Sequence, residues 1–353
     1  MKQVPVILFG AGGVGSALLK QIVNGRSHLA TRNQIQFKIV AVCDSRSWQL
    51  EPGGLSDQQL LDIVDRKANG KPVGEKRPSN LETLNTLAKA DLQNVVVVDI
   101  TAADGLEPVV DRALELDYGV VLANKKIFAG PLASAQKYFN NSRVRHESTV
   151  GGGQPVIATL RYLLDSNDPI HEIEGQLSGT LGFICQQLDQ GVAFSTAVAE
   201  AKARGYTEPD PREDLGGLDV MRKVMILGRM SGWPLETTDI EVESLYTPDL
   251  ADLTVPEFME AVSGLDEAIS QRVAEAKANG QVLRYLAHVQ DGKGTVGLKA
   301  VSAASGLANL KYISFRTDNY HDEQLMICGK GAGVEMTAAG VVGDMVDLVR
   351  EEF

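Results

Sequence analysis

Apolar runs alternate with stretches of helical apolar spacing over the first 150 residues, and this alternation predicts strands connected by helices. Apolar side chains at helical spacing follow the first run from Ala17, and residues 106–116 repeat the pattern. One run contains four consecutive valines, which is typical of a strand buried in a parallel sheet. The pattern therefore indicates a doubly wound α/β unit. Its strands are predicted at residues 4–9, 37–43, 95–99, 119–122 and 144–147.

Residues 45–79 interrupt this pattern, because they are rich in glycine, proline and charge and poor in apolar periodicity. We interpret them as a surface insertion with one short helix near residues 57–67.

The pattern changes after Pro155, where strands with one polar face are mixed with helices. Helices are predicted at residues 156–164 and 194–204 and from Gly217. Strands are predicted at residues 170–177, 282–290, 295–302, 309–314 and 324–328. These elements indicate a second, α+β domain at residues 153–329. A last helix from Gly333 is expected to return to the first domain, which then comprises residues 1–152 and 330–353.

Composition narrows the classes of function. The chain has 353 residues, 44% of them hydrophobic, and a formal net charge of −12. This charge argues against nucleic acid and anionic membranes as partners. No apolar run approaches the roughly 20 residues of a membrane-spanning helix. The three cysteines lie far apart in no metal-binding spacing, so we expect reduced thiols in a cytoplasmic protein.

The turn after the first predicted strand carries the spacing Gly10-x-Gly12-x-x-Gly15. A strand, this glycine turn and a helix together form the dinucleotide-binding fingerprint. Gly10 permits the tight turn, Gly12 lets the backbone approach a pyrophosphate, and Gly15 lets the helix pack close to the strand. The sequence therefore predicts binding of NAD or NADP.

Polar residues follow three of the predicted strands, at the sheet edge where such cofactors bind. Asp44 favours NAD, because an acidic residue there binds the ribose 2′-hydroxyl, whereas Arg46 could pair with the 2′-phosphate of NADP. The two signals conflict and leave the choice of cofactor open. Thr101 and Lys125 follow two other strands. Lys125 could hold a carboxylate or steer a hydroxyl group, or it could simply lie in solvent.

Residues 205–223 concentrate carboxylates around one lysine. Pro209 and Pro211 exclude regular structure, so the residues before each of them should be extended. Asp219 and Lys223 are four residues apart on the helix that follows, which puts them on one face. An isolated surface ion pair is the simplest interpretation of that spacing. The density of carboxylates, from Glu208, Asp210, Glu213 and Asp214, favours a site for a cationic substrate group.

Three consecutive glycines follow Glu147 in the segment STVGGGQP. Glycines permit unusual backbone angles that can turn carbonyl groups towards an ion. With the Glu147 carboxylate, the turn could bind a hard cation. A hinge between the two domains is an equally good interpretation.

Several of these motifs together resemble the homoserine dehydrogenase family over nearly the whole chain. They are GxGxxG, ANKK, ESTVGGGQP, LSGTL and GYTEPDPREDLxGLDVxRK. The resemblance implies NAD(P)-dependent interconversion of L-homoserine and L-aspartate 4-semialdehyde, on the route to threonine and methionine. It also implies a homodimer formed through the second domain. Within the family, the chain resembles the short form, which lacks a C-terminal regulatory domain.

The resemblance also implies roles for individual residues. Lys223 corresponds to the general acid/base, and Lys125 to its partner at the reacting oxygen. Residues expected to bind the substrate are Gly179, Thr180, Leu181, Tyr206, Glu208, Asp214 and Asp219. Residues expected to contact the cofactor are Gly10, Gly12, Gly13, Val14, Gly15, Asp44, Thr101, Lys125 and Gly333. A sodium site is implied at Glu147 and the backbone oxygens of Val150, Gly152 and Gln154.

Two other functions fit parts of the sequence. An aldehyde-oxidising dehydrogenase would need a nucleophilic cysteine, for which Cys185 is the candidate. A catalytically silent NAD(P)-sensing protein would have no reason to keep Glu208, Asp219 and Lys223 together.

Overall fold

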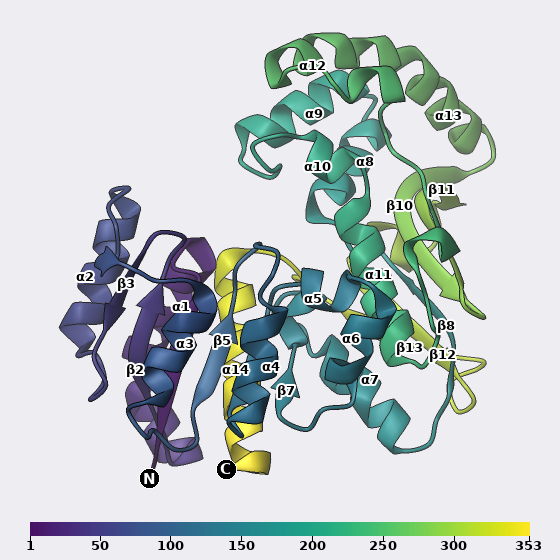
Figure 1. The fold of residues 1–353 in the computed structure, drawn as a ribbon. Coiled ribbons are helices and arrows are strands. Elements are labelled where there is room, and N and C mark those ends of the chain that lie inside the picture. Colours follow the sequence, from purple (N-terminus) through teal and green to yellow (C-terminus); the bar gives the residue numbers. More distant parts are fainter. The chain divides into compact units, whose positions relative to one another are not determined.

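The computed structural model describes residues 1–353, which form two compact units (Figure 1). The first unit comprises Met1–Ile157 and Ala332–Phe353, and the second comprises Ala158–Gly331. The chain therefore leaves the first unit once and returns to it. The first division falls within helix α7 (Val156–Asp165).

A seven-stranded sheet forms the centre of the first unit, with the order β4-β3-β2-β1-β5-β6-β7. The five neighbouring strands β2, β1, β5, β6 and β7 pair in parallel. All four residues of β5 are buried, as expected for a strand covered by helices on both faces. The predicted Rossmann-type α/β fold is confirmed. The strands are β1 (Lys2–Phe9), β2 (Ile35–Cys43), β3 (Ser47–Leu50), β4 (Glu75–Lys76), β5 (Val96–Asp99), β6 (Gly119–Leu122) and β7 (Val144–Arg145).

Helices from both ends of the first unit's sequence build one core with this sheet. Buried Leu18 and Ile22 from α1 join Val341 and Met345 from α14 in a single apolar cluster. The helices are α1 (Gly13–His28), α2 (Asp57–Ala68), α3 (Asn80–Ala88), α4 (Glu107–Glu115), α5 (Lys126–Ala129), α6 (Leu132–Phe139) and α14 (Val334–Glu352), with the short turns η1 (Leu29–Asn33) and η2 (Glu147–Thr149).

Two sequence-based interpretations of this unit need correction. Residues 45–79 contain the predicted helix α2, but they also contain β3 and β4, which extend the sheet in antiparallel pairs. These strands are too short to show an apolar period. The strand predicted at residues 144–147 ends at Arg145, because residues from Glu147 form the 3₁₀ turn η2.

The second unit contains a six-stranded sheet with the order β13-β12-β8-β10-β11-β9, antiparallel except between β9 and β11. This mixed architecture confirms the predicted α+β class. The strand predicted at residues 309–314 begins only at Tyr312, because Gly306–Asn309 forms a 3₁₀ turn. The strands are β8 (Ile170–Gly175), β9 (Ile240–Val242), β10 (Gln281–Gln290), β11 (Lys293–Ser302), β12 (Tyr312–Thr317) and β13 (Leu325–Cys328).

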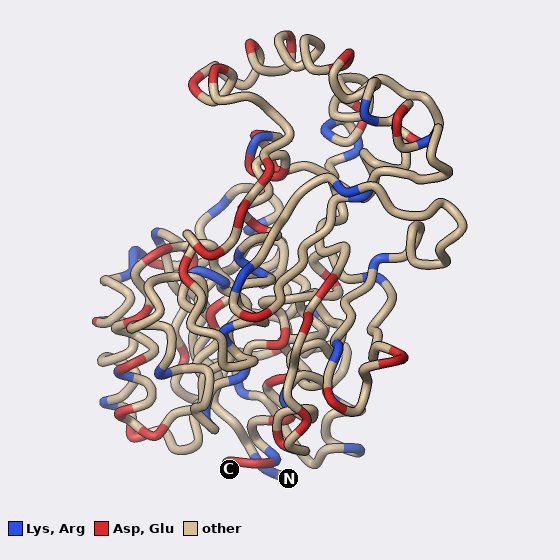
Figure 2. Tube along the Cα trace, turned by 90° about the vertical axis from the view of Figure 1, so that its right-hand side faces the viewer, with Lys and Arg blue, Asp and Glu red and all other residues tan.

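Helices of the second unit include several that the sequence pattern did not reveal, namely α8, α10, α12 and α13. Residues 236–275 carry many more carboxylates than basic side chains, and Figure 2 shows acidic positions along this helical segment. No helix is long and apolar enough to span a membrane. The helices are α8 (Gly179–Asp189), α9 (Phe194–Ala203), α10 (Arg212–Leu215), α11 (Leu218–Met230), α12 (Val255–Ala261) and α13 (Asp266–Ala278), with the turns η3 (Thr237–Asp239), η4 (Pro248–Leu250), η5 (Val262–Leu265) and η6 (Gly306–Asn309).

Candidate functional site

The glycine turn between β1 and α1 leaves room for a ligand at one position and none at another. Gly10 has a φ of 110°, which side chains rarely allow. A Cβ atom at Gly15 would lie 2.2 Å from the carbonyl oxygen of Gly10, whereas a Cβ at Gly12 would meet nothing within 4 Å. Gly12 also caps α1 without any side-chain hydrogen bond. Exposed amides at an uncapped helix N-terminus suit a pyrophosphate, so these residues fit a dinucleotide.

A second helix begins beside this turn. Gly333, with a φ of 111°, precedes α14. A Cβ atom at Gly13 would lie 3.1 Å from Cγ1 of Val334. Val14 packs against the apolar core of the unit. Gly13, Val14 and Gly333 therefore lie together, although they are more than 300 residues apart in sequence.

The Asp44 carboxylate is tied to its own loop and to a lysine. Its Oδ1 accepts hydrogen bonds from the amides of Arg46 (2.8 Å) and Ser47 (2.7 Å) and from the Ser47 hydroxyl (2.9 Å). Its Oδ2 accepts one from Lys67 Nζ at 2.9 Å. Burial alone would raise the pKa of Asp44, but the hydrogen bonds from Lys67 and the two amides outweigh it and hold the pKa well below its ordinary value.

A buried network organises the edge that carries Thr101 and Lys125. Asn124 Nδ2 donates to Asp99 Oδ2 (3.0 Å) and to the carbonyl oxygen of Ala103 (2.9 Å), and the Thr101 amide donates to Asp99 Oδ1 (2.9 Å). Burial raises the pKa of Asp99 despite these bonds. Sequence reasoning did not single out Asp99, although its position at the end of a run of valines marks it as a buried acid.

The turn after β7 is fastened to α7 and α14. Glu147 is buried; its Oε1 accepts the Ile157 amide at 2.7 Å, and its own amide donates to Asp344 Oδ2 at 2.8 Å. Gly151 and Gly152 both have positive φ values, as glycine allows. The sodium ligands expected at Val150, Gly152 and Gln154 stay a prediction.

Lys223 lies at the centre of the second unit's candidate site. Its helix, α11, begins after Gly217, whose φ of 72° favours glycine. The Lys223 ammonium lies 2.6 Å from Asp219 Oδ2 and donates a hydrogen bond of 2.7 Å to the Leu177 carbonyl oxygen. Its side chain is only 13% exposed, against 46% for Asp219. The lysine is therefore held in a fixed position while its acidic neighbour remains accessible.

The start of α8 is joined to the carboxylate-rich loop. Ser178 caps α8 by accepting the Leu181 amide at 3.1 Å. Two residues after Ser178, the Thr180 hydroxyl donates a hydrogen bond of 2.6 Å to the Tyr206 carbonyl oxygen. Half of the Tyr206 side chain remains exposed. The structure thus brings residues 177–181, Tyr206 and Lys223 into one region of the second unit.

Carboxylates of this loop separate into two kinds. Asp214 accepts the Glu208 amide at 2.8 Å, and burial raises the pKa of Asp214 despite that bond. Asp210 instead forms an ion pair with Arg212 at 2.7 Å, and Arg212 also binds the carbonyl oxygen of Leu253. The carboxylate of Asp210 is therefore paired within the loop, which it braces through Arg212.

Cys185 does not have the properties of a nucleophile. It is 1% exposed in α8, and burial raises the pKa of its thiol to about 12. A reactive cysteine needs an accessible thiolate. The structure therefore argues against the aldehyde-oxidising alternative.

Comparisons with known proteins match both units to the same family. Residues 155–346 match the model of the homoserine dehydrogenase family, and residues 10–148 match the model of the homoserine dehydrogenase NAD-binding domain. The structure superposes on that of a Candida auris protein of unknown function with a TM-score of 0.85, at 29% identity over 99% of this chain and 98% of the other. An Archaeoglobus fulgidus structure described as a putative homoserine dehydrogenase gives a TM-score of 0.76 at 24% identity. This similarity supports only the assignment of the fold.

Relatives of two lengths match in sequence. A bifunctional aspartokinase/homoserine dehydrogenase of Haemophilus influenzae is 35% identical over 98% of this chain, but the match spans only 43% of that protein. The homoserine dehydrogenase of Saccharomyces cerevisiae is 33% identical over 99% of both chains. From the family models and these relatives together, we conclude that the chain belongs to the homoserine dehydrogenase family.

Proposed function

We propose that this chain catalyses the NAD(P)-dependent interconversion of L-homoserine and L-aspartate 4-semialdehyde, on the route to threonine and methionine. When bound, the nicotinamide cofactor supplies the hydride acceptor or donor. The residues of the chain have three other tasks: to hold the amino acid, to orient its reacting carbon and to move the hydroxyl proton.

The position of Lys223 is the observation that carries this proposal. A nearly buried ammonium group between a carboxylate and a carbonyl oxygen has little freedom to turn away from its partners. A lysine fixed in this way suits proton transfer to and from one substrate oxygen, because general acid/base catalysis depends on geometry first. The accessible carboxylates of Asp219 and Glu208 suit the substrate ammonium. Lys125 is proposed as a second basic group at the reacting oxygen.

The direct test measures homoserine-dependent formation of NADH and of NADPH by the purified full chain. We expect absorbance at the reduced nicotinamide band to rise only when both homoserine and a cofactor are present. A chain that binds the cofactor but never reduces it would instead be the silent sensor.

Replacing Lys223 with alanine should lower kcat by about 10²–10⁴ because proton transfer then falls to water. Cofactor affinity should stay nearly unchanged, since the variant alters only the second unit. Lys277→Ala is the matched control, because it removes the same charge from a lysine that lies exposed in the last turn of α13. Equal losses of turnover in the two variants, or loss of cofactor binding in Lys223→Ala, would contradict the proposed role.

Two further properties are proposed from the family resemblance. The first is a homodimer, which sedimentation of the purified chain would test; a monomer at micromolar concentration would reject it. The second is a sodium ion near Glu147, supported by the buried carboxylate and the glycine-rich turn. Activity that is identical in sodium and in tetramethylammonium buffers would argue against a functional ion.

A further inference from the structure

The Arg212 side chain joins the carboxylate-rich loop to a separate segment of the second unit. Its Nε and Nη2 donate to the two oxygens of the Asp210 carboxylate at 3.0 and 2.7 Å. Its Nη1 donates to three carbonyl oxygens at the end of the turn η4, those of Leu250 (3.3 Å), Ala251 (2.6 Å) and Leu253 (2.6 Å). Every nitrogen of the guanidinium group therefore has a partner within the protein, and the side chain is only 13% exposed.

We propose that Arg212 is a positioning residue for the ammonium group of the substrate, because it holds in place the helix that fixes the backbone of Glu208. The inference rests on the proposed function, in which Glu208 and Asp219 bind that ammonium group. Arg212 does not bind the substrate itself, since its nitrogens are already occupied. It acts on the affinity for the amino acid through the shape of the loop.

Helix α10 carries the connection from Arg212 to Glu208. Arg212 and Asp214 lie two residues apart in this single-turn helix. Asp214 Oδ2 accepts the Glu208 amide at 2.8 Å, which ties the first half of the loop to α10. The Leu245 amide donates to the carbonyl oxygen of Leu215, the last residue of α10, at 2.9 Å. A displacement of α10 would therefore move the Glu208 backbone with it.

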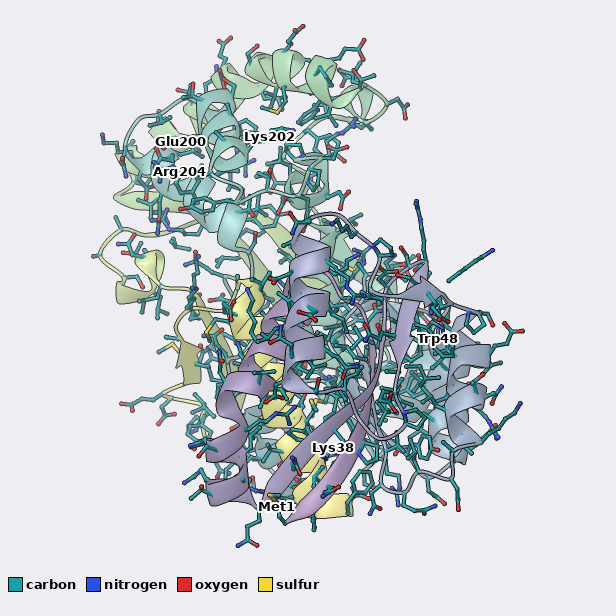
Figure 3. The ribbon with its side chains drawn as sticks, turned by 90° about the vertical axis from the view of Figure 1, so that its left-hand side faces the viewer. Met1, Lys38, Trp48, Glu200, Lys202 and Arg204 are labelled. Carbon is teal, nitrogen blue, oxygen red and sulfur yellow. The ribbon has the colours of Figure 1, made fainter.

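Two further hydrogen bonds hold the first half of the loop. The Thr180 hydroxyl donates to the Tyr206 carbonyl oxygen, as described above. Lys202, labelled on α9 in Figure 3, donates to the Pro209 carbonyl oxygen at 2.9 Å. The bond from Lys202 is exposed, so water competes for both of its partners. Arg212 instead anchors the second half of the loop, and its contacts are largely shielded from water.

The segment that Arg212 binds is well defined by its own contacts. Thr254 begins α12 with a capping box, in which Glu257 accepts the Thr254 amide at 2.8 Å. Phe258 of α12 is buried, and its ring centroid lies 5.4 Å from Arg212 Cζ, within cation–π distance. Hydrogen bonds from Arg212 also hold the pKa of Asp210 below its ordinary value, so this pair stays charged at neutral pH. Bidentate, charge-assisted contacts of this kind fix geometry as well as adding energy.

The test measures steady-state oxidation of homoserine by the purified full chain and by Arg212→Lys, with the nicotinamide cofactor that the natural chain reduces. Lysine keeps the charge but has no planar fork for the carboxylate and the carbonyl oxygens together. We expect the KM for homoserine to rise about 10- to 100-fold. The kcat should change by less than about 3-fold, because contacts made equally in the ground and transition states affect KM. The inhibition constant of 4-hydroxybutanoate, which lacks the ammonium group, should stay the same.

Arg284→Lys is the matched control for a general loss of stability. Arg284 also binds a carboxylate with two nitrogens, at 2.6 and 3.1 Å from Asp189, and it donates to the Leu283 carbonyl oxygen. Asp189 is the last residue of α8, whereas Gly179 at the candidate site is the first. We expect Arg284→Lys to lower the melting temperature without raising the KM for homoserine.

Asp210→Asn is the second test variant, and it applies even where Arg212→Lys does not fold. It weakens the hold on Arg212 at a partly exposed position, so the KM should rise by a smaller factor. An unchanged KM in the folded variants would overturn the inference and leave the proposed function standing. Equal rises in KM in Arg284→Lys, or weaker inhibition by 4-hydroxybutanoate to the same extent, would overturn it as well. Absence of homoserine oxidation by the natural chain would overturn the inference and the proposed function together.

Discussion

At the scale of single residues, the glycines of the first turn have different physical roles. Gly15 has no space for a side chain because the Gly10 carbonyl oxygen lies where its Cβ would be. Gly12 has open space around it and lies at the N-terminus of α1. Gly15 therefore allows close packing of the helix, whereas Gly12 lets a ligand approach the backbone.

Alanine at these two positions should therefore have different effects on stability and on cofactor binding. Gly15→Ala should lower the free energy of unfolding by about 2–3 kcal/mol, as overpacking does. Gly12→Ala should change it by less than about 0.5 kcal/mol but weaken cofactor binding. Urea unfolding and NADPH titration on the same samples would measure both effects. Gly25→Ala, on the same helix and also without neighbours, should leave binding intact. A Gly12→Ala variant that binds normally would contradict this division.

Sequence reasoning had its clearest signals where the pattern is local. The glycine turn and the spacing of Asp219 and Lys223 each lie within one segment. Sequence reasoning missed what depends on distant contacts: Lys67 reaches Asp44 from 23 positions away, and Asp99 meets Asn124 across 25. Pairing of this kind is set by the folded sheet and leaves no period in the sequence.

At the scale of elements, α14 is docked with almost no clearance. A Cβ atom at Gly340 would lie 2.4 Å from Ser148 Oγ and 2.6 Å from the Gly152 carbonyl oxygen. A Cβ at Gly153 would lie 2.3 Å from the Met336 carbonyl oxygen. Glycines on both partners thus let the helix approach the backbone of the turn after β7.

We expect Gly340→Ala to lower the free energy of unfolding by about 2–3 kcal/mol, because the helix or the turn must move. Gly343→Ala is its matched control, three residues further along the same helix with nothing within 4 Å. That change should be neutral or raise stability by about 0.5–1 kcal/mol, since alanine favours the helix. Chemical denaturation of the two variants would decide; equal stability would refute the account of close docking.

The fold itself was largely predictable, but two kinds of element were not. Short apolar runs predicted the central strands, and the small residues after Gly329 predicted a last helix from Gly333, which is α14. β3 and β4 have four and two residues, too few to establish a period, and they depend on a buried serine and on Gly74. Helices α12 and α13 lie largely within the acidic segment at residues 236–275, where charged residues obscure the apolar face.

At the scale of the whole molecule, the first unit is discontinuous, because residues from both sides of the second unit build its core. Val341, Met345, Leu348 and Val349 of α14 are completely buried there. Burial of four such side chains contributes about 6–12 kcal/mol. The total stability of a typical domain is about 5–15 kcal/mol.

A chain that stops at Gly331 should therefore fail to fold its first unit, while residues 158–331 keep their sheet and helices. Hydrogen exchange followed by mass spectrometry would report the two units separately. We expect rapid exchange in β1 and β5 and slow exchange in β10 and β11. Slow exchange throughout both units of the truncated chain would show that α14 is dispensable.

The return of the chain also has a consequence for its synthesis. A ribosome adds about 5–20 residues per second, so the 174 residues of the second unit separate residue 157 from residue 332 by about 10–35 s. During that interval the nascent sheet exposes the apolar surface that α14 later covers. Chaperones that shield emerging polypeptides should therefore matter more for the amino-terminal half of this protein than for the half made after it.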